Sequence, residues 1–219
     1  DRSAAPDSRA RDVEMSKYVY AFAEGNKDLK YLLGGKGANL AEMAGMGLPV
    51  PAGFTVSTEA CRVFFDSGVV PAELNAQVDE HLAALEAGMG KPLGATDDPL
   101  LVSVRSGSMF SMPGMMETVL DVGLNDSSVI GLAKAADDER FAWDSYRRLI
   151  QMFGKTVLGI EGGHFDAAFD AVKKARGAVS DLDLDAADLQ RVVVAYKGVV
   201  RTQAGREFPQ HPREQLDPA

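Results

Sequence analysis

Two glycine-rich segments of the sequence each place one cation beside backbone that a ligand can approach closely. The first, residues 34–40, contains Gly35 and Lys36, and its glycines open a predicted helix over residues 38–46. Free amide groups at the start of a helix, together with the positive end of its dipole, favour a phosphate group. We therefore interpret Lys36 as a candidate phosphate contact.

The second segment, residues 102–107, carries Arg105 directly after an apolar run, 100–104, that predicts a buried strand. A guanidinium at the end of a strand can donate two parallel hydrogen bonds from a rigid position. A lysine and an arginine beside two glycine-rich turns together predict a polyphosphate site. Each has a simpler interpretation: Lys36 as a solvated lysine at a tight turn, and Arg105 as a structural arginine paired with a carboxylate. The first segment is not a Walker A loop, because the chain has no Gly-x4-Gly-Lys-Ser/Thr sequence.

A third segment, residues 106–116, is predicted to be a loop that covers the phosphates and the base of a nucleotide. A glycine lets backbone approach phosphate, hydroxyl groups donate hydrogen bonds, and flexible thioethers can cover a base. The methionines could instead pack in the core beneath the loop. The candidate ligand-binding residues here and just after it are Ser111, Met112, Gly114, Met115, Met116 and Thr118.

These segments resemble the nucleotide-binding domain of the pyruvate, phosphate dikinases. The resemblance covers residues 16–216, and its most specific part is the run from Ser111. The motifs that carry it, in order, are GGKGANLAEM (34–43), PVPAGF (49–54), VSVRSG (102–107), SMPGMMET (111–118), FAWDSYRR (141–148) and EFPQ (207–210).

The resemblance implies an α+β fold of the ATP-grasp type, of which this chain would hold the first two subdomains. It also implies ATP, phosphate and Mg²⁺ as ligands, with Lys36 and Arg105 relieving charge during phosphoryl transfer. The family converts ATP, phosphate and pyruvate into AMP, pyrophosphate and phosphoenolpyruvate through a phosphohistidine on another domain. The metal ligands and the adenine-facing residues are expected beyond residue 219, so we expect this chain alone to be inactive.

Composition narrows the classes of partner. The 219 residues carry a net charge of −9, which argues against a nucleic-acid-binding surface. A single cysteine, Cys61, allows no intramolecular disulfide, and we interpret it as a small core residue of a helix over 58–67. No metal site is predicted within the chain, and no apolar stretch suits a membrane span. The expected location is cytoplasmic.

The pattern of residues predicts a disordered tail (1–15), an α/β subdomain (16–124), a helical subdomain (125–204) and a return segment (205–219). Strands are predicted at 18–23, 54–56, 100–104 and 118–122, and helices at 71–87, 138–153 and 186–204. Asp185 and Asp188 are placed to cap the last helix. Two alternatives stay open. One is a stand-alone, non-catalytic module that binds a nucleotide or phosphate. The other is a fragment of an enzyme like phosphoenolpyruvate synthase.

Overall fold

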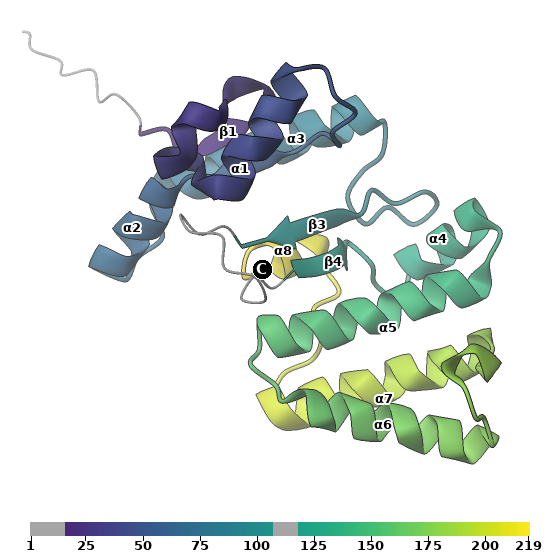
Figure 1. Cartoon of the computed structure of the whole chain (residues 1–219). Helices are drawn as coiled ribbons and strands as arrows, with labels where there is room; N and C mark the ends of the chain where they lie inside the picture. Colours follow the sequence, from purple (N-terminus) through teal and green to yellow (C-terminus); the bar gives the residue numbers. More distant parts are fainter. Residues whose placement is uncertain (1–15, 107–117) are drawn as a thin grey trace, which may run out of the picture. The chain divides into compact units, whose positions relative to one another are not determined.

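The computed structural model describes residues 16–106 and 118–219 (Figure 1), and the tail predicted for residues 1–15 lies outside them. The chain divides into two units, one up to Leu82 and one from Ala83, and the division falls within helix α3 (Ala72–Met89). This division differs from the change of sequence pattern near residue 124. The subdomains 16–124, 125–204 and 205–219 therefore stay predictions.

The first unit is built on two short antiparallel strands, β1 (Val19–Ala21) and β2 (Phe54–Val56), with helices on both faces. Side chains alternate between the faces of a strand. Tyr20 packs with a buried cluster on helix α1 (Lys30–Gly45), while Val19 packs in a second cluster that includes side chains of α3. The strand predicted at 54–56 has the predicted bounds, and the one predicted at 18–23 is shorter.

Helix α2 (Thr58–Ser67) has the predicted bounds because its ends carry local signals. The Ser57 side chain accepts a hydrogen bond from the Ala60 amide, and Gly68 ends the helix in the left-handed conformation. Our interpretation of Cys61 as a core residue was wrong, because its side chain is exposed. The helix buries only Ala60, and the next residue along the helix points to another side.

Among its described residues, the second unit contains a strand pair followed by a series of helices. Strand β3 (Val102–Arg105) pairs with β4 (Thr118–Val122), joining Arg105 to Thr118 and Val102 to Val122. The register shifts between these pairs, so that Leu120 and Asp121 face the single residue Ser103. This is a β-bulge, and Asp121 has a φ of 61°. The helices are α4 (Ser128–Ala136), α5 (Glu139–Thr156), α6 (Gly162–Arg176), α7 (Ala186–Ala204) and α8 (Pro212–Leu216).

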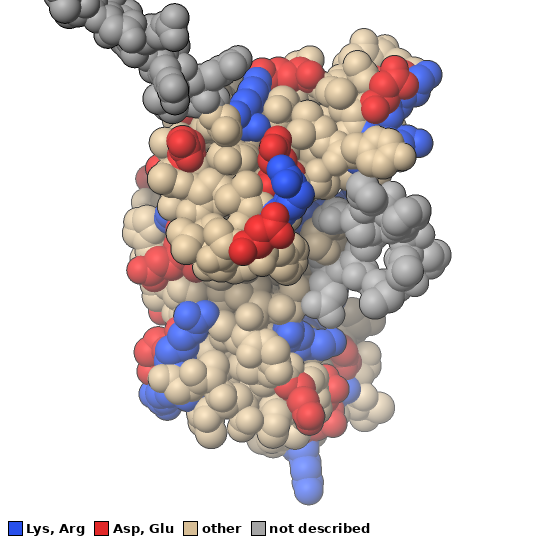
Figure 2. All heavy atoms as spheres, turned by 90° about the vertical axis from the view of Figure 1, so that its left-hand side faces the viewer, with Lys and Arg blue, Asp and Glu red and all other residues tan. Residues whose placement is uncertain are grey.

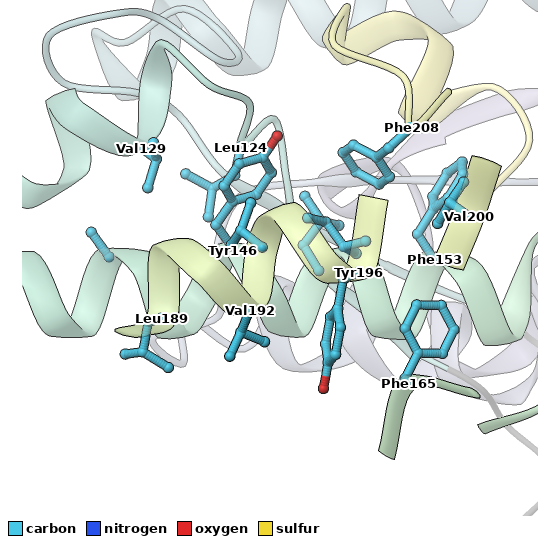
Figure 3. Packing of buried hydrophobic residues seen from close by; sticks show 14 of the residues in the cluster. Leu124, Val129, Tyr146, Phe153, Phe165, Leu189, Val192, Tyr196, Val200 and Phe208 are labelled. Carbon is cyan, nitrogen blue, oxygen red and sulfur yellow. The ribbon is translucent and has the colours of Figure 1, made fainter. Parts of the chain in front are cut away.

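The core of the second unit lies between α5, α6 and α7 (Figure 3). The apolar stripe predicted on α5 is buried as expected. Aromatic rings fill the core edge to face: Phe165 against Tyr196, and Phe153 against Phe208, with ring centres 5.1 and 5.5 Å apart. Burial raises the pKa of Tyr196 to about 12. The stripe members are Ala142, Tyr146, Leu149, Ile150 and Phe153.

Two polar clusters connect the elements of this unit. At the start of α7, Asp185 and Asp188 form the predicted capping box, and the buried Asp188 carboxylate also accepts hydrogen bonds from Arg176 and Arg191. In the second cluster, the buried Gln215 side chain of α8 accepts from the Gly123 amide and donates to the carbonyls of Leu124 and Pro209. The C-terminal segment is thereby attached to the end of β4.

Charged side chains of both signs are interspersed on the face shown in Figure 2. Within the part of the chain that the structure describes, no helix combines the length and apolar character needed to cross a membrane.

Candidate phosphate-binding site

Helix α1 is interrupted at Gly34, just before the candidate lysine. Gly34 has φ 69° and ψ 167°, a combination that only glycine adopts readily. Helical conformation resumes at Gly35, so a new helix start lies at Gly35, Lys36 and Gly37. The first amide groups of a helix have no carbonyl partner within it. The sequence predicted a helix opening among these glycines, and the break at Gly34 gives it a defined first residue.

Lys36 is partly buried, and its neighbours Gly37 and Ala38 are buried. Across residues 16–106 and 118–219, Lys36 makes no ion pair and no side-chain hydrogen bond. A lysine without a carboxylate partner keeps its full charge available to an anion. The simpler interpretation, a solvated lysine at a tight turn, is weakened by this partial burial beside a helix start.

The polar side chains of Thr58 and Glu42 form hydrogen bonds within the first unit. The Thr58 hydroxyl donates to the Tyr31 carbonyl, which connects the start of α2 to α1 just before the break at Gly34. The Glu42 carboxylate of α1 accepts a hydrogen bond from the Lys27 amide at 3.1 Å and lies 3.7 Å from the Lys27 ammonium group. Sequence reasoning missed Thr58, because nothing in the sequence indicates which carbonyl its hydroxyl will reach.

Arg105 is the last residue of β3 and pairs in register with Thr118, the first residue of β4. Its side chain is exposed, and it has no ion-pair or hydrogen-bond partner among the residues with described positions. The position at a strand end agrees with the sequence prediction, although the strand begins two residues later than expected.

The remaining candidate residues, Ser111, Met112, Gly114, Met115 and Met116, lie outside the described residues. Lys36 belongs to the first unit and Arg105 to the second, so their convergence on one ligand stays a prediction. Among the described side chains, no three of the His, Cys, Asp and Glu type are grouped as metal ligands.

Comparison with known proteins identifies relatives for nearly the whole chain. Residues 30–80, which include Lys36, match the family described as "Pyruvate phosphate dikinase, AMP/ATP-binding domain". The chain is 50% identical to pyruvate, phosphate dikinase of Clostridium symbiosum over 92% of its residues. It is also 50% identical to the chloroplastic enzyme of Mesembryanthemum crystallinum over 98% of its residues. Identity to the Rhizobium meliloti enzyme is 47%, over 92% of the chain.

The matched region is only 23% of the length of each of these three relatives. It is their N-terminal part. The resemblance that the glycine-rich motifs indicated is confirmed: this chain is similar, over nearly all of its length, to the N-terminal part of the pyruvate, phosphate dikinases.

Proposed function

We propose that this chain is the ATP-binding part of a pyruvate, phosphate dikinase, with a fold of the ATP-grasp type. One observation supports this most: a partly buried lysine, without an ion-pair partner among the described residues, lies at a helix start created by Gly34, inside the region that matches a nucleotide-binding family. In the proposed reaction of the longer protein, ATP, phosphate and pyruvate give AMP, pyrophosphate and phosphoenolpyruvate. The phosphoryl group would pass through a histidine on another domain.

In this proposal the first unit binds the phosphate groups of ATP. The amides of Gly35, Lys36 and Gly37 would donate hydrogen bonds to phosphate oxygens, and the Lys36 ammonium would neutralise negative charge. Glycine at these positions leaves the backbone open to a close approach. Arg105, which can bind two phosphate oxygens at once, would contribute the second cation. Positioning and charge stabilisation are the main requirements of phosphoryl transfer.

The described residues do not fit a Mg²⁺ site. Magnesium requires oxygen ligands in near-octahedral geometry, and the carboxylate nearest in sequence to the glycine turn, Glu42, is occupied by Lys27. We therefore derive no step through a metal held by these residues. The cytoplasmic location also stays a proposal, because some of the plant relatives are named chloroplastic.

The test is an NMR titration of the 219-residue chain with ATP, and separately with pyrophosphate, following each backbone amide. Because the residues that face the adenine are expected outside this chain, we expect weak binding, with a dissociation constant of about 1 mM. The amides of Gly35, Lys36 and Gly37 should shift most. Lys36→Ala should weaken binding at least about tenfold, on the order of 1.4 kcal/mol.

Two variants serve as matched controls. Lys30→Ala removes an exposed lysine from the same helix before the break, and Arg206→Ala removes an exposed arginine from the same unit as Arg105. Both should bind ATP like the unchanged chain, whereas Arg105→Ala should bind more weakly. Equal affinities for Lys36→Ala and Lys30→Ala would contradict the proposal. So would AMP production by the isolated chain from ATP, phosphate and pyruvate, because it would show that no further domain is needed.

A further inference from the structure

Gly37 lies in close contact with strand β2. A methyl group added at Gly37 would lie 2.8 Å from Cγ2 of Thr55 and 3.0 Å from its Oγ1, closer than non-bonded atoms tolerate. The same methyl group would lie 3.3 Å from Cβ of Leu33. Thr55 therefore occupies the space beside Gly37 that any other residue there would need for its own side chain.

Thr55 cannot easily move aside, because its strand is paired with β1 and the residues that follow it are also hydrogen-bonded. It is paired in register with Tyr20 of β1, and the Ser57 amide donates to the Tyr18 carbonyl at 2.7 Å. Thr58 then donates to the Tyr31 carbonyl of α1. The branched Cβ of threonine also restricts its rotamers, so the face that it presents to α1 is rigid.

The helix start therefore packs against Thr55 of β2 through Gly37, the residue that follows Lys36. We propose that Thr55 is a positioning residue for phosphate binding: its contact with Gly37 sets the depth and direction of the turn that carries Lys36. This inference rests on the proposed function, because it assigns a support to the same site. It also gives Gly37 a packing role distinct from the conformational role of Gly34.

The experiment combines Gly37→Ala with changes at Thr55 in the 219-residue chain. Gly37→Ala should shift the amide resonances of Gly35 and Lys36 without ligand, and should weaken ATP binding about tenfold. Alanine is the better helix former, so lost helix propensity cannot cause this effect. Gly45→Ala, at the end of the same helix, is the matched control, because an added methyl group meets no atom within 4 Å there.

Substitutions at Thr55 show whether Gly37→Ala acts through its contact with Thr55 or disturbs the fold in general. Thr55→Ala removes both atoms that would collide, so the Gly37→Ala/Thr55→Ala double variant should regain the original amide shifts and bind within about threefold of the unchanged chain. Gly37→Ala/Thr55→Val keeps the crowding and should not recover. Thr55→Val alone preserves the contact and should bind normally, whereas Thr55→Ala alone should bind about threefold more weakly.

Two results would overturn the inference: spectra of Gly37→Ala that differ no more than those of Gly45→Ala, or a double variant with Thr55→Ala that stays as disturbed as Gly37→Ala. If the unchanged chain binds neither ATP nor pyrophosphate, the proposed function fails. The ligand-free spectra still decide whether Thr55 positions the turn.

Discussion

Replacing Asp188 by alanine should destabilise the second unit more than any change at an exposed ion pair. The Asp188 side chain is 1% exposed and accepts hydrogen bonds from Nε of Arg176 at 3.1 Å and from an Nη of Arg191 at 2.6 Å. It also accepts from the Asp185 amide at 3.3 Å, completing the capping box of α7. Asp188→Ala removes all three interactions at once.

The magnitude follows from the exposure of the partners. A hydrogen bond to a charged group contributes about 1.5–3 kcal/mol when both sides are buried. Here the side chains of Arg176 and Arg191 are 53% and 65% exposed, so they regain water in the variant, and we reduce their joint contribution to about 1–2 kcal/mol. Loss of the cap adds about 1 kcal/mol. The expected decrease in the free energy of unfolding is about 2–3 kcal/mol, or about 5–10 °C in Tm.

Chemical denaturation followed by tryptophan fluorescence provides the measurement, because the only tryptophan, Trp143, lies in α5 of this unit. Glu207→Ala is the control: its carboxylate lies 3.5 Å from Arg201, and both side chains are more than two-thirds exposed. This control should change stability by less than about 0.5 kcal/mol. An Asp188→Ala variant as stable as Glu207→Ala would refute the reasoning.

Two further predictions concern the end of β4. Burial raises the pKa of the Asp121 carboxyl, and the charge of Arg148 opposes this shift only in part. The folded state therefore favours the protonated carboxyl, and the contribution of Asp121 to the free energy of unfolding is lost as the pH rises through the raised pKa. Asp121→Asn removes the charge and tolerates the positive φ, so it should raise the denaturation midpoint at pH 7 and flatten its dependence on pH above about pH 4. A lower midpoint at pH 7 would contradict this. Gln215→Ala leaves the Gly123 amide and the Leu124 carbonyl without their side-chain partner, so the free energy of unfolding should decrease by about 2–4 kcal/mol. Hydrogen exchange at the Gly123 amide should become faster. Unchanged exchange there would show that the hydrogen bond from Gly123 to Gln215 is unimportant.

The elements that depend on local chemistry could be predicted from the sequence. Asp185 and Asp188 marked the start of α7 because a capping box needs only residues three positions apart. The bounds predicted for helix α2 also coincide with local signals in the structure, because Ser57 caps its start and Gly68 ends it in the left-handed conformation. The buried stripe of α5 followed from its helical period.

Contacts between distant residues could not be predicted in this way. Cys61 was assigned to the core although it is exposed, because the pattern of a short helix does not fix which side meets its neighbours. Gln215 is separated from Gly123 by 92 residues, and no local pattern relates them. In the candidate site, the glycines around Lys36 indicated a helix start, but the contact of Gly37 with Thr55 depends on the pairing of two strands.

Within the second unit, segments that are far apart in the sequence lie side by side at Gly94. A methyl group added at Gly94 would lie 2.4 Å from Cγ of Pro212 and 2.8 Å from the Gly123 carbonyl oxygen, so the chain arriving from α3 passes directly beside the start of α8. The close contacts at Gly94 therefore join the segment that follows α3 to the segment that begins α8, so a larger side chain at Gly94 would disturb the packing of both.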